Sequence, residues 1–355
     1  MVQALAKISL KRVQSEGTPL IDGEHVTFVW RGKQAPLLTG DFSDWERGQP
    51  IELEKAGKNT WSVSLELPED AYIEYTFIDR SDPKKRYPDP NNQRLAYNGL
   101  GEYNNFFYMP GAAPTTLTQL SKVALRGSVR RYSVDTWYLV SGKTRSVYLY
   151  QPPVAEPVPL LVVWDGLDYL RRARLPEILD NLIAQGRLRP VALAMVHNGG
   201  KARTAEYGCS EGTLAFLLHK IIPLAQQELR LLDIDTKPGC FGVLGASMGG
   251  LMALFTALRL PKIFGYVLSQ SGAFSLGDYD TLVYELAGYL PTPLPKIYLD
   301  VGIYDFRILL AANRRMVQHL NQHNYEVAYH EYPAGHNYTS WRNDLAGGLE
   351  WLFGR

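Results

Sequence analysis

The hydrophobic and polar positions divide the chain into two stretches of different texture. Between residues 24 and 109, short runs partly alternate apolar with polar residues, and turn-forming residues separate them. These runs are HVTFVW (25–30), APLLTG (35–40), TWSVSLEL (60–67) and YIEYTFI (72–78). Alternation with a period of two is typical of strands that bury one face. The pattern therefore predicts a small all-β sandwich. Residues 110–120, rich in Pro, Gly and Thr, are predicted to form a linker.

From residue 121 the pattern changes to apolar runs that end in small or polar residues. They are SVYLYQP (146–152), PLLVVWDG (159–166), PVALAMVHN (190–198), CFGVLGAS (240–247), FGYVLSQSG (264–272) and KIYLDVG (296–302). Longer stretches between them, such as residues 211–229 and 249–260, have helical character. Strands that alternate with helices predict an α/β fold with a mostly parallel sheet covered on both faces. Chemistry is then expected just after the apolar runs, because ligands of such sheets bind at the carboxyl ends of the strands.

The sequence Gly245-Ala246-Ser247-Met248-Gly249 matches the pattern G-x-S-x-G. It follows an apolar run directly and opens an Ala/Leu-rich helix. A strand–turn–helix setting is what the nucleophile elbow of an α/β-hydrolase requires. We therefore expect Ser247 to be the nucleophile, against the alternative of a Gly/Ser-rich turn without chemistry. The Met248 N–H, at the start of the helix, is the first expected oxyanion donor.

A second oxyanion donor is expected from a loop after an early strand. Asp165-Gly166-Leu167 follows the run PLLVVW in that position. Gly166 allows close approach of the backbone, and its own N–H or that of Leu167 is the expected donor. The alternative is an ordinary turn, since Asp-Gly pairs are common in turns.

Four histidines follow Ser247, and one of them is the expected general base. His319 and His323 belong to a polar helical stretch, and His330 belongs to a strand-like run. His336 lies in the Pro/Gly loop PAGHNYTSW, after the last strand and before the terminal helix. Because hydrolases of this fold carry nucleophile, acid and base in that order along the chain, His336 is the preferred base.

The acid is expected after the penultimate strand, and two aspartates compete for this role. Asp305 lies in GIYDF, three residues beyond that strand, whereas Asp300 lies within it. Alternation along the strand would point Asp300 away from the tip. Asp305 also fits a helix N-cap. Its place between the nucleophile and the base makes Asp305 the preferred acid.

Composition narrows the class of protein. The formal net charge is +1, without the basic excess of a nucleic-acid binder. Two cysteines, Cys209 and Cys240, cannot form a disulfide framework for 355 residues. Neither a secretion signal nor an apolar run of about 20 residues is evident. These features predict a soluble cytoplasmic protein that binds neither membranes nor nucleic acid, and leave its oligomeric state open. The serine mechanism needs no metal or organic cofactor.

With these residues identified, roughly residues 125–355 resemble the enterochelin-esterase branch of the esterase D-like superfamily. The resemblance rests on VVWDG (162–166), RTAEYGCS (203–210), GASMGGLMAL (245–254), FGYVLSQSGAF (264–274), DVGIYDF (300–306) and GHNYTSW (335–341). Members often carry Glu at the acid position, so Asp305 is a departure. The resemblance implies an α/β-hydrolase and places a set of residues near the substrate: Asp165, Arg203, Glu206, Tyr207 and Trp341.

The N-terminal region resembles the early-set, carbohydrate-binding-like domain of glycogen-branching enzymes, an immunoglobulin-like sandwich. Its marks are LTGDFSDW (38–45), TWSVSLELPEDAYIEYTF (60–77) and YPDPNN (87–92). This divides the chain into an early-set domain with its linker (1–115) and a hydrolase domain (116–355). Trp45 and Trp61 are either sugar-stacking platforms or core residues. The domain is expected to shape the substrate cleft, with stabilisation of the hydrolase and polysaccharide anchoring as alternatives.

Three functions follow from these patterns. The first is an enterochelin-esterase-like serine esterase acting on a small-molecule ester, with a siderophore as the candidate substrate. The second is a feruloyl or acetylxylan esterase whose N-terminal domain binds polysaccharide. The third is a carbohydrate-binding protein with an inactive hydrolase half, which the presence of Ser247, Asp305 and His336 argues against.

Overall fold

The computed structural model describes residues 9–99, 101–119, 125–277 and 279–355. Residue 120, the end of the predicted linker, lies outside the described residues. The chain forms two compact units. Unit 1 consists of Met1–Pro114 together with Gly302–Arg307 and Tyr332–Ser340, and unit 2 consists of Thr115–Val301, Ile308–Glu331 and Trp341–Arg355. Two short segments from the C-terminal half thus group with the N-terminal region.

Unit 1 is built on two antiparallel sheets. The first has the strand order β1-β2-β6-β5, and the second has the order β4-β3-β7-β10-β9, with β8 paired to β7. The strands are β1 (Leu20–Asp22), β2 (His25–Arg31), β3 (Leu37–Gly40), β4 (Ile51–Glu52), β5 (Glu54–Gly57), β6 (Thr60–Glu66), β7 (Tyr72–Ile78), β8 (Arg86–Tyr87), β9 (Leu95–Tyr97) and β10 (Tyr103–Tyr108). Helix α1 (Leu10–Glu16) precedes them, and the 3-10 turns η1 (Asp41–Ser43) and η2 (Trp45–Arg47) follow β3.

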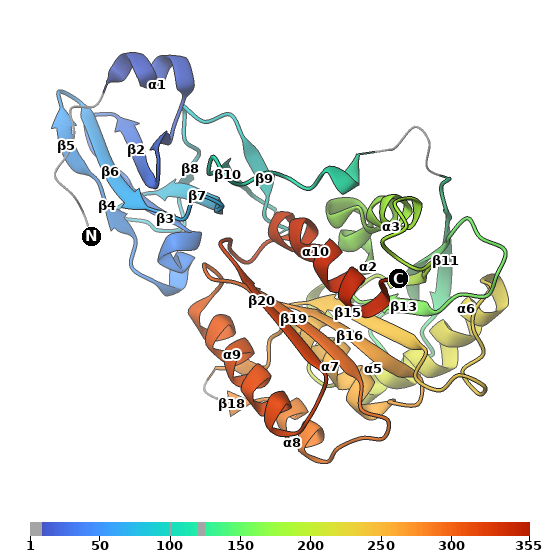
Figure 1. The fold of residues 1–355 in the computed structure, drawn as a ribbon. Coiled ribbons are helices and arrows are strands. Elements are labelled where there is room, and N and C mark those ends of the chain that lie inside the picture. Colours follow the sequence, from blue (N-terminus) through green and yellow to red (C-terminus); the bar gives the residue numbers. More distant parts are fainter. Residues whose placement is uncertain (1–8, 100, 120–124, 278) are drawn as a thin grey trace. The chain divides into compact units, whose positions relative to one another are not determined.

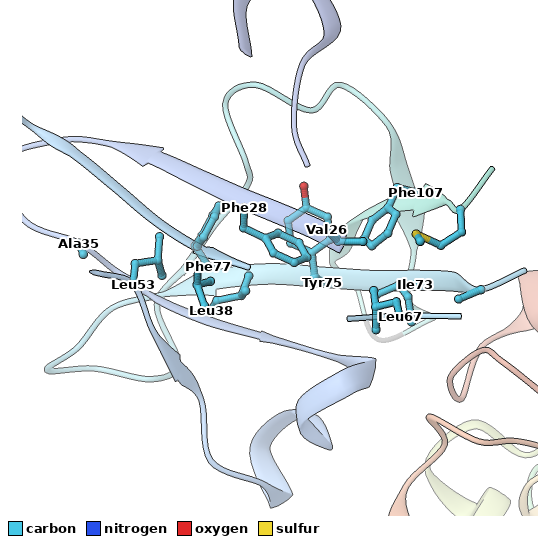
Figure 2. Packing of buried hydrophobic residues seen from close by; sticks show 13 residues of the cluster. Val26, Phe28, Ala35, Leu38, Leu53, Leu67, Ile73, Tyr75, Phe77 and Phe107 are labelled. Atoms are coloured by element: carbon cyan, nitrogen blue, oxygen red, sulfur yellow. The ribbon is translucent and has the colours of Figure 1, made fainter. Parts of the chain in front are cut away.

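The core of the sandwich lies between these sheets. Alternate residues of β7, namely Ile73, Tyr75 and Phe77, pack with Phe28 of β2 and Phe107 of β10 (Figure 2). All five side chains are fully buried. The edge-to-face contacts of Tyr75 with Phe28 and Phe107 follow the geometry that aromatic rings prefer. The alternation predicted a β-rich N-terminal region, and the structure confirms it.

Unit 2 contains an eight-stranded sheet with the order β11-β12-β14-β13-β15-β16-β19-β20. Its strands are β11 (Ser128–Asp135), β12 (Thr144–Gln151), β13 (Leu160–Val163), β14 (Ala192–Val196), β15 (Phe241–Ala246), β16 (Phe264–Gln270), β19 (Lys296–Gly302) and β20 (Val327–Tyr332). The pairs β14/β13, β13/β15, β15/β16 and β16/β19 are parallel, and β11/β12 and β12/β14 are antiparallel. Strands β13, β14 and β15 are buried along their whole length, as a doubly covered parallel sheet requires.

Helices lie on both sides of this sheet (Figure 1). They are α2 (Gly166–Asp168), α3 (Leu175–Ala184), α4 (Arg203–Tyr207), α5 (Glu211–Phe216), α6 (Ile222–Glu228), α7 (Met248–Arg259), α8 (Val283–Gly288), α9 (Arg307–Gln322) and α10 (Tyr338–Phe353). Shorter elements are the 3-10 turns η3 (Thr116–Thr118) and η5 (Gly200–Ala202), the π-helical turns η4 (Tyr169–Ala173) and η6 (Leu217–Ile221), and the two-residue strands β17 (Ser275–Leu276) and β18 (Tyr279–Asp280). Among the described residues, none of these helices combines the length and apolarity needed to cross a bilayer.

One helical prediction differs from the structure in detail. Residues 211–229 were expected to form a single helical stretch, but the structure divides them into α5, η6 and α6. Pro223 stands at the start of α6. Since proline has no backbone N–H, the regular hydrogen bond to His219 is lost, and a π-helical turn accommodates the break.

Candidate active site

Ser247 lies at the junction between β15 and α7 with a strained backbone. Its φ of 57° and ψ of −122° are rarely adopted by residues other than glycine. The Ser247 N–H donates to the Gln270 carbonyl at 2.8 Å, and the Ser247 carbonyl accepts from the Ala273 N–H at 3.0 Å. These bonds fix the turn to the end of β16 and the segment after it. The strained junction is the local geometry of a nucleophile elbow.

Small residues on both sides of Ser247 allow this turn to close. A Cβ atom placed on Gly245 would lie 2.2 Å from the Gly249 carbonyl oxygen, and one on Gly250 would lie 2.5 Å from the Ser269 hydroxyl oxygen. Side chains at these positions would force the strand and the helix apart. Packing at the turn therefore requires glycine at position 245 of the motif and at position 250, just beyond it.

The expected oxyanion donors occupy the starts of two helices. Met248 is the first residue of α7, and Gly166 and Leu167 belong to α2, which follows β13. The first N–H groups of a helix have no partner within the helix and are suited to bind negative charge. A Cβ atom on Gly166 would lie 2.2 Å from the Met195 carbonyl carbon, so this backbone packs directly against β14.

Asp165 is almost fully buried, and its carboxylate is bound from two sides. Arg203 donates to both oxygens at 2.7 and 2.6 Å, and the Asn198 side chain donates to Oδ1 at 2.7 Å. Arg203 also donates to the Ala246 carbonyl at 3.3 Å. The Asp165 N–H donates to the Tyr207 hydroxyl at 3.0 Å. This network joins the loop after β13 to the residue that precedes Ser247.

Glu206 forms a buried ion pair with Arg145 of β12. Arg145 donates to both carboxylate oxygens at 2.8 Å, and Ser141 donates through its N–H and its hydroxyl. Burial alone raises the pKa of Glu206, but the hydrogen bonds from Arg145 and Ser141 outweigh it and hold the pKa below its ordinary value. Sequence reasoning missed Arg145. The available signal was a charge at a position of β12 that shares its buried face with Val147 and Leu149.

Asp305 and His336 are brought together in unit 1. Nδ1 of His336 lies 2.9 and 3.1 Å from the two carboxylate oxygens of Asp305. The Asp305 side chain is fully buried, and that of His336 is 16% exposed. The Phe306 N–H donates to Asp305 Oδ1 at 2.7 Å. A buried carboxylate bonded to Nδ1 is the arrangement that orients a catalytic imidazole and selects its tautomer.

The rival candidates have other partners. Asp300 is fully buried within β19 and accepts from the Gln270 amide at 2.9 Å. His330 pairs with Asp344, with 2.7 Å between Nδ1 and Oδ1. His319 Nε2 lies 2.8 Å from the Tyr284 carbonyl, and His323 Nδ1 lies 2.9 Å from the carbonyl of His319.

Two further predicted site residues, Tyr207 and Trp341, are buried as well. Tyr207 is 1% exposed and packs against Trp164, and Trp341 is 4% exposed and donates from its indole N–H to the Ser271 hydroxyl at 2.9 Å. Across the described ranges, no group of three or more His, Cys, Asp or Glu side chains is placed to hold a metal ion.

Comparison with known families identifies the family of this chain. The family model described as Putative esterase matches residues 140–352, more than half of the chain. The chain belongs to the Putative esterase family. Within this family, the esterase is 25% identical to the iron(III) enterobactin esterase of Dickeya dadantii (strain 3937), over 96% of this chain and 92% of the relative. It is 23% identical to the iron(III) salmochelin esterase of Escherichia coli O6:H1 (strain CFT073), over 97% and 93%.

A solved structure shares the esterase's fold. The ferric enterobactin esterase from Salmonella typhimurium aligns with a TM-score of 0.75 at 21% identity, over 92% of both chains. The match extends over the N-terminal β-rich region as well as the α/β region. The resemblance to enterochelin esterases expected from the sequence is confirmed.

Proposed function

We propose that this esterase is a serine carboxylic-ester hydrolase of the enterochelin-esterase type, with Ser247 as nucleophile, His336 as base and Asp305 as acid. The observation that carries the proposal is the strained backbone of Ser247 at the start of α7, in a chain that belongs to an esterase family. Nucleophile elbows hold their serine in this conformation. The bond between His336 Nδ1 and the buried Asp305 supports the other two roles.

The proposed reaction proceeds in two steps. His336 accepts the proton of the Ser247 hydroxyl as the serine oxygen attacks the ester carbonyl. The N–H groups of Met248 and of Gly166 or Leu167 stabilise the oxyanion. Collapse of this intermediate releases the alcohol, which takes the proton from His336 and leaves an acyl-enzyme. Water, deprotonated by His336, then releases the acid and restores the serine.

The proposed substrate is the ester backbone of an iron(III) siderophore. The relatives named as enterobactin and salmochelin esterases match this chain over more than nine-tenths of its length, including the sandwich. Iron would enter as part of the substrate. Asp165, Glu206 and Tyr207 have protein partners for their polar groups, and we propose that they shape the site by holding its loops. Arg203, whose side chain is 28% exposed, remains a proposed substrate contact. The buried Trp341, whose indole N–H donates to Ser271, joins the residues proposed to shape the site.

Replacement of the nucleophile tests the mechanism. Ser247→Ala should remove nearly all turnover of p-nitrophenyl acetate and all labelling by a fluorophosphonate probe, with an unchanged melting temperature. His336→Ala should cost about as much, and the double variant little more, because the two residues act as one unit. Ser146→Ala, on β12, is the matched control and should retain wild-type rates. Turnover by Ser247→Ala at the wild-type rate would refute the assignment.

The substrate class is tested on the same enzyme by comparing kcat/KM for ferric enterobactin, methyl ferulate and acetylated xylan. The proposal expects ferric enterobactin to rank first by at least tenfold. A higher kcat/KM for methyl ferulate or acetylated xylan would instead favour an esterase of plant polysaccharide.

A further inference from the structure

The outer face of strand β7 is buried, although only one face of this strand packs into the sandwich core. Ile73 and its alternates point into the core, yet Tyr72 and Glu74 on the opposite face are only 4% and 2% exposed. The Tyr72 N–H donates to the Pro333 carbonyl at 3.0 Å, and Tyr72 forms an isolated parallel bridge with Ala334. Segment 332–340, which carries His336, therefore pairs with the Tyr72 end of β7, beyond the part of the strand that pairs with β3.

Asp41, at the start of η1, contacts this segment at Gly335. A Cβ atom on Gly335 would lie 2.1 Å from both Cγ and Oδ1 of Asp41, so the backbone preceding His336 rests on the carboxylate. The carboxylate is itself held by the Trp45 indole N–H and the Glu74 N–H, each at 2.8 Å. Burial raises the pKa of Asp41, and the nearby charges of Glu74 and Asp305 raise it further.

Segments 302–307 and 332–340 are also joined to each other. The Ile303 N–H donates to the Tyr332 carbonyl at 2.8 Å, and the Tyr304 N–H donates to the Ala334 carbonyl at 3.1 Å. A Cβ atom on Gly302 would lie 1.9 Å from the Ala334 carbonyl oxygen. Any displacement of one segment must therefore displace the other.

Arg47 of η2 makes a second contact from the sandwich. Its guanidinium carbon lies 3.8 Å from the centre of the Phe306 ring. The Phe306 ring in turn lies 4.8 Å from the His336 ring, at an interplanar angle of 32°. Arginine, phenylalanine and histidine thus form a short stack that ends on the imidazole bonded to Asp305.

We propose that the β-sandwich is a positioning element of the hydrolase: Asp41 and Arg47 hold segments 302–307 and 332–340 so that Asp305 and His336 keep their bonded geometry. This inference rests on the proposed function of that pair. It assigns the η1–η2 turn, DFSDWER (41–47), a positioning role through contacts with protein, in place of sugar binding. Neither residue reacts with the substrate, and each acts through His336.

A positioning residue and a substrate contact can be distinguished by their effects on kcat and KM. Misplacement of the base by a fraction of an ångström slows the chemical steps and lowers kcat, whereas loss of a substrate contact raises KM. A residue needed only for folding lowers the fraction of active enzyme and the melting temperature without changing the rate per active site.

The test compares Arg47→Ala with Arg80→Ala, a matched control that removes an arginine bonded to Ala35 and Glu52 elsewhere on the sandwich. Arg47→Ala should lower kcat for p-nitrophenyl acetate about five- to tenfold per fluorophosphonate-titrated serine, the size of one cation–π contact expressed as a rate. KM should stay within twofold. Arg47→Lys should recover part of kcat, because it keeps the cation without the planar stack.

Hydrogen–deuterium exchange gives a second readout that does not depend on turnover. Arg47→Ala should increase deuterium uptake in peptides covering 302–307 and 332–340, and leave peptides of β15 and α7 unchanged. Gly335→Ala, which displaces the segment from Asp41, should do the same and reduce kcat at least 100-fold. The proposal would be overturned if Arg47→Ala showed the same deuterium uptake and kcat as Arg80→Ala. A rise in the KM of Arg47→Ala without a fall in kcat would also overturn it. Turnover by Ser247→Ala would instead refute the serine mechanism and leave the exchange result to decide the positioning role.

Discussion

Asp305 and Asp300 lie five residues apart in the chain but have different environments. Asp305 binds His336 Nδ1, whereas Asp300 binds the Gln270 amide inside the sheet. The sequence favoured Asp305 as the acid because it follows the strand, and of the two aspartates it is Asp305 that contacts His336 in the structure. The sequence could not supply the partner of Asp300, because Gln270 belongs to the neighbouring strand β16.

The two aspartates should respond differently to substitution. Asp305→Asn should lower kcat by several orders of magnitude, since the imidazole loses its negatively charged partner and its preferred tautomer. Asp300→Asn should leave kcat within about tenfold and chiefly lower the melting temperature, because an acceptor oxygen for Gln270 remains. Parallel kinetics on p-nitrophenyl acetate decide between them. Loss of turnover in Asp300→Asn alone would transfer the acid role.

His330 should affect stability rather than turnover. The hydrogen bond to Asp344 raises the pKa of His330 above its ordinary value. A raised pKa in the folded state stabilises the protein below the unfolded pKa of about 6.5, and this stabilisation is lost as pH rises through the folded pKa. His330→Gln should therefore reduce the free energy of unfolding more at pH 5.5 than at pH 9. Urea titrations at both values measure this, and inactivation of His330→Gln at an unchanged melting temperature would instead identify it as the base.

At the scale of elements, the strands of the parallel sheet were the most predictable part. Five apolar runs correspond to the parallel strands β13, β14, β15, β16 and β19, because a strand covered on both faces needs a nearly continuous apolar run. The sixth corresponds to β12, an antiparallel strand that buries alternate residues. The edge strand β11 was not predicted. Its sequence SVRRYSVD is mostly exposed and carries two arginines, so it lacks that signal. The short strands β8 and β9 were missed for the same reason.

The loop after β13 gives a prediction at this scale. In Gly166→Ala the new methyl group would overlap the backbone of Met195 and Val196, so α2 must move away from β14. Displacement of an oxyanion donor should lower kcat about 100-fold or more. Gly288→Ala is the matched control, because the closest atom to its Cβ would be His323 Nε2 at 3.6 Å, an ordinary contact. Equal kcat in the two variants would exclude this loop from the oxyanion site.

At the scale of the whole molecule, the sequence indicated a β-rich region followed by an α/β region, and the structure contains both. What it could not indicate is that segments 302–307 and 332–340 group with the sandwich. Contacts such as Asp41 with Gly335 join residues almost 300 positions apart, and no local pattern records such a pairing. The residues of the candidate site were accessible from local motifs, whereas the groups that support them, such as Arg47 and Arg145, depend on tertiary packing.

The division of unit 1 into three stretches of chain has a consequence for recombination between relatives. A chimera that takes residues 1–114 from one esterase and the remainder from another would pair a foreign η1–η2 turn with unmatched segments 302–307 and 332–340. The crossover after residue 114 interrupts no helix or strand, yet Asp41 and Gly335, which are in contact, would then come from different parents. Gene shuffling in this family should therefore yield active progeny mainly when the three stretches are inherited from the same parent.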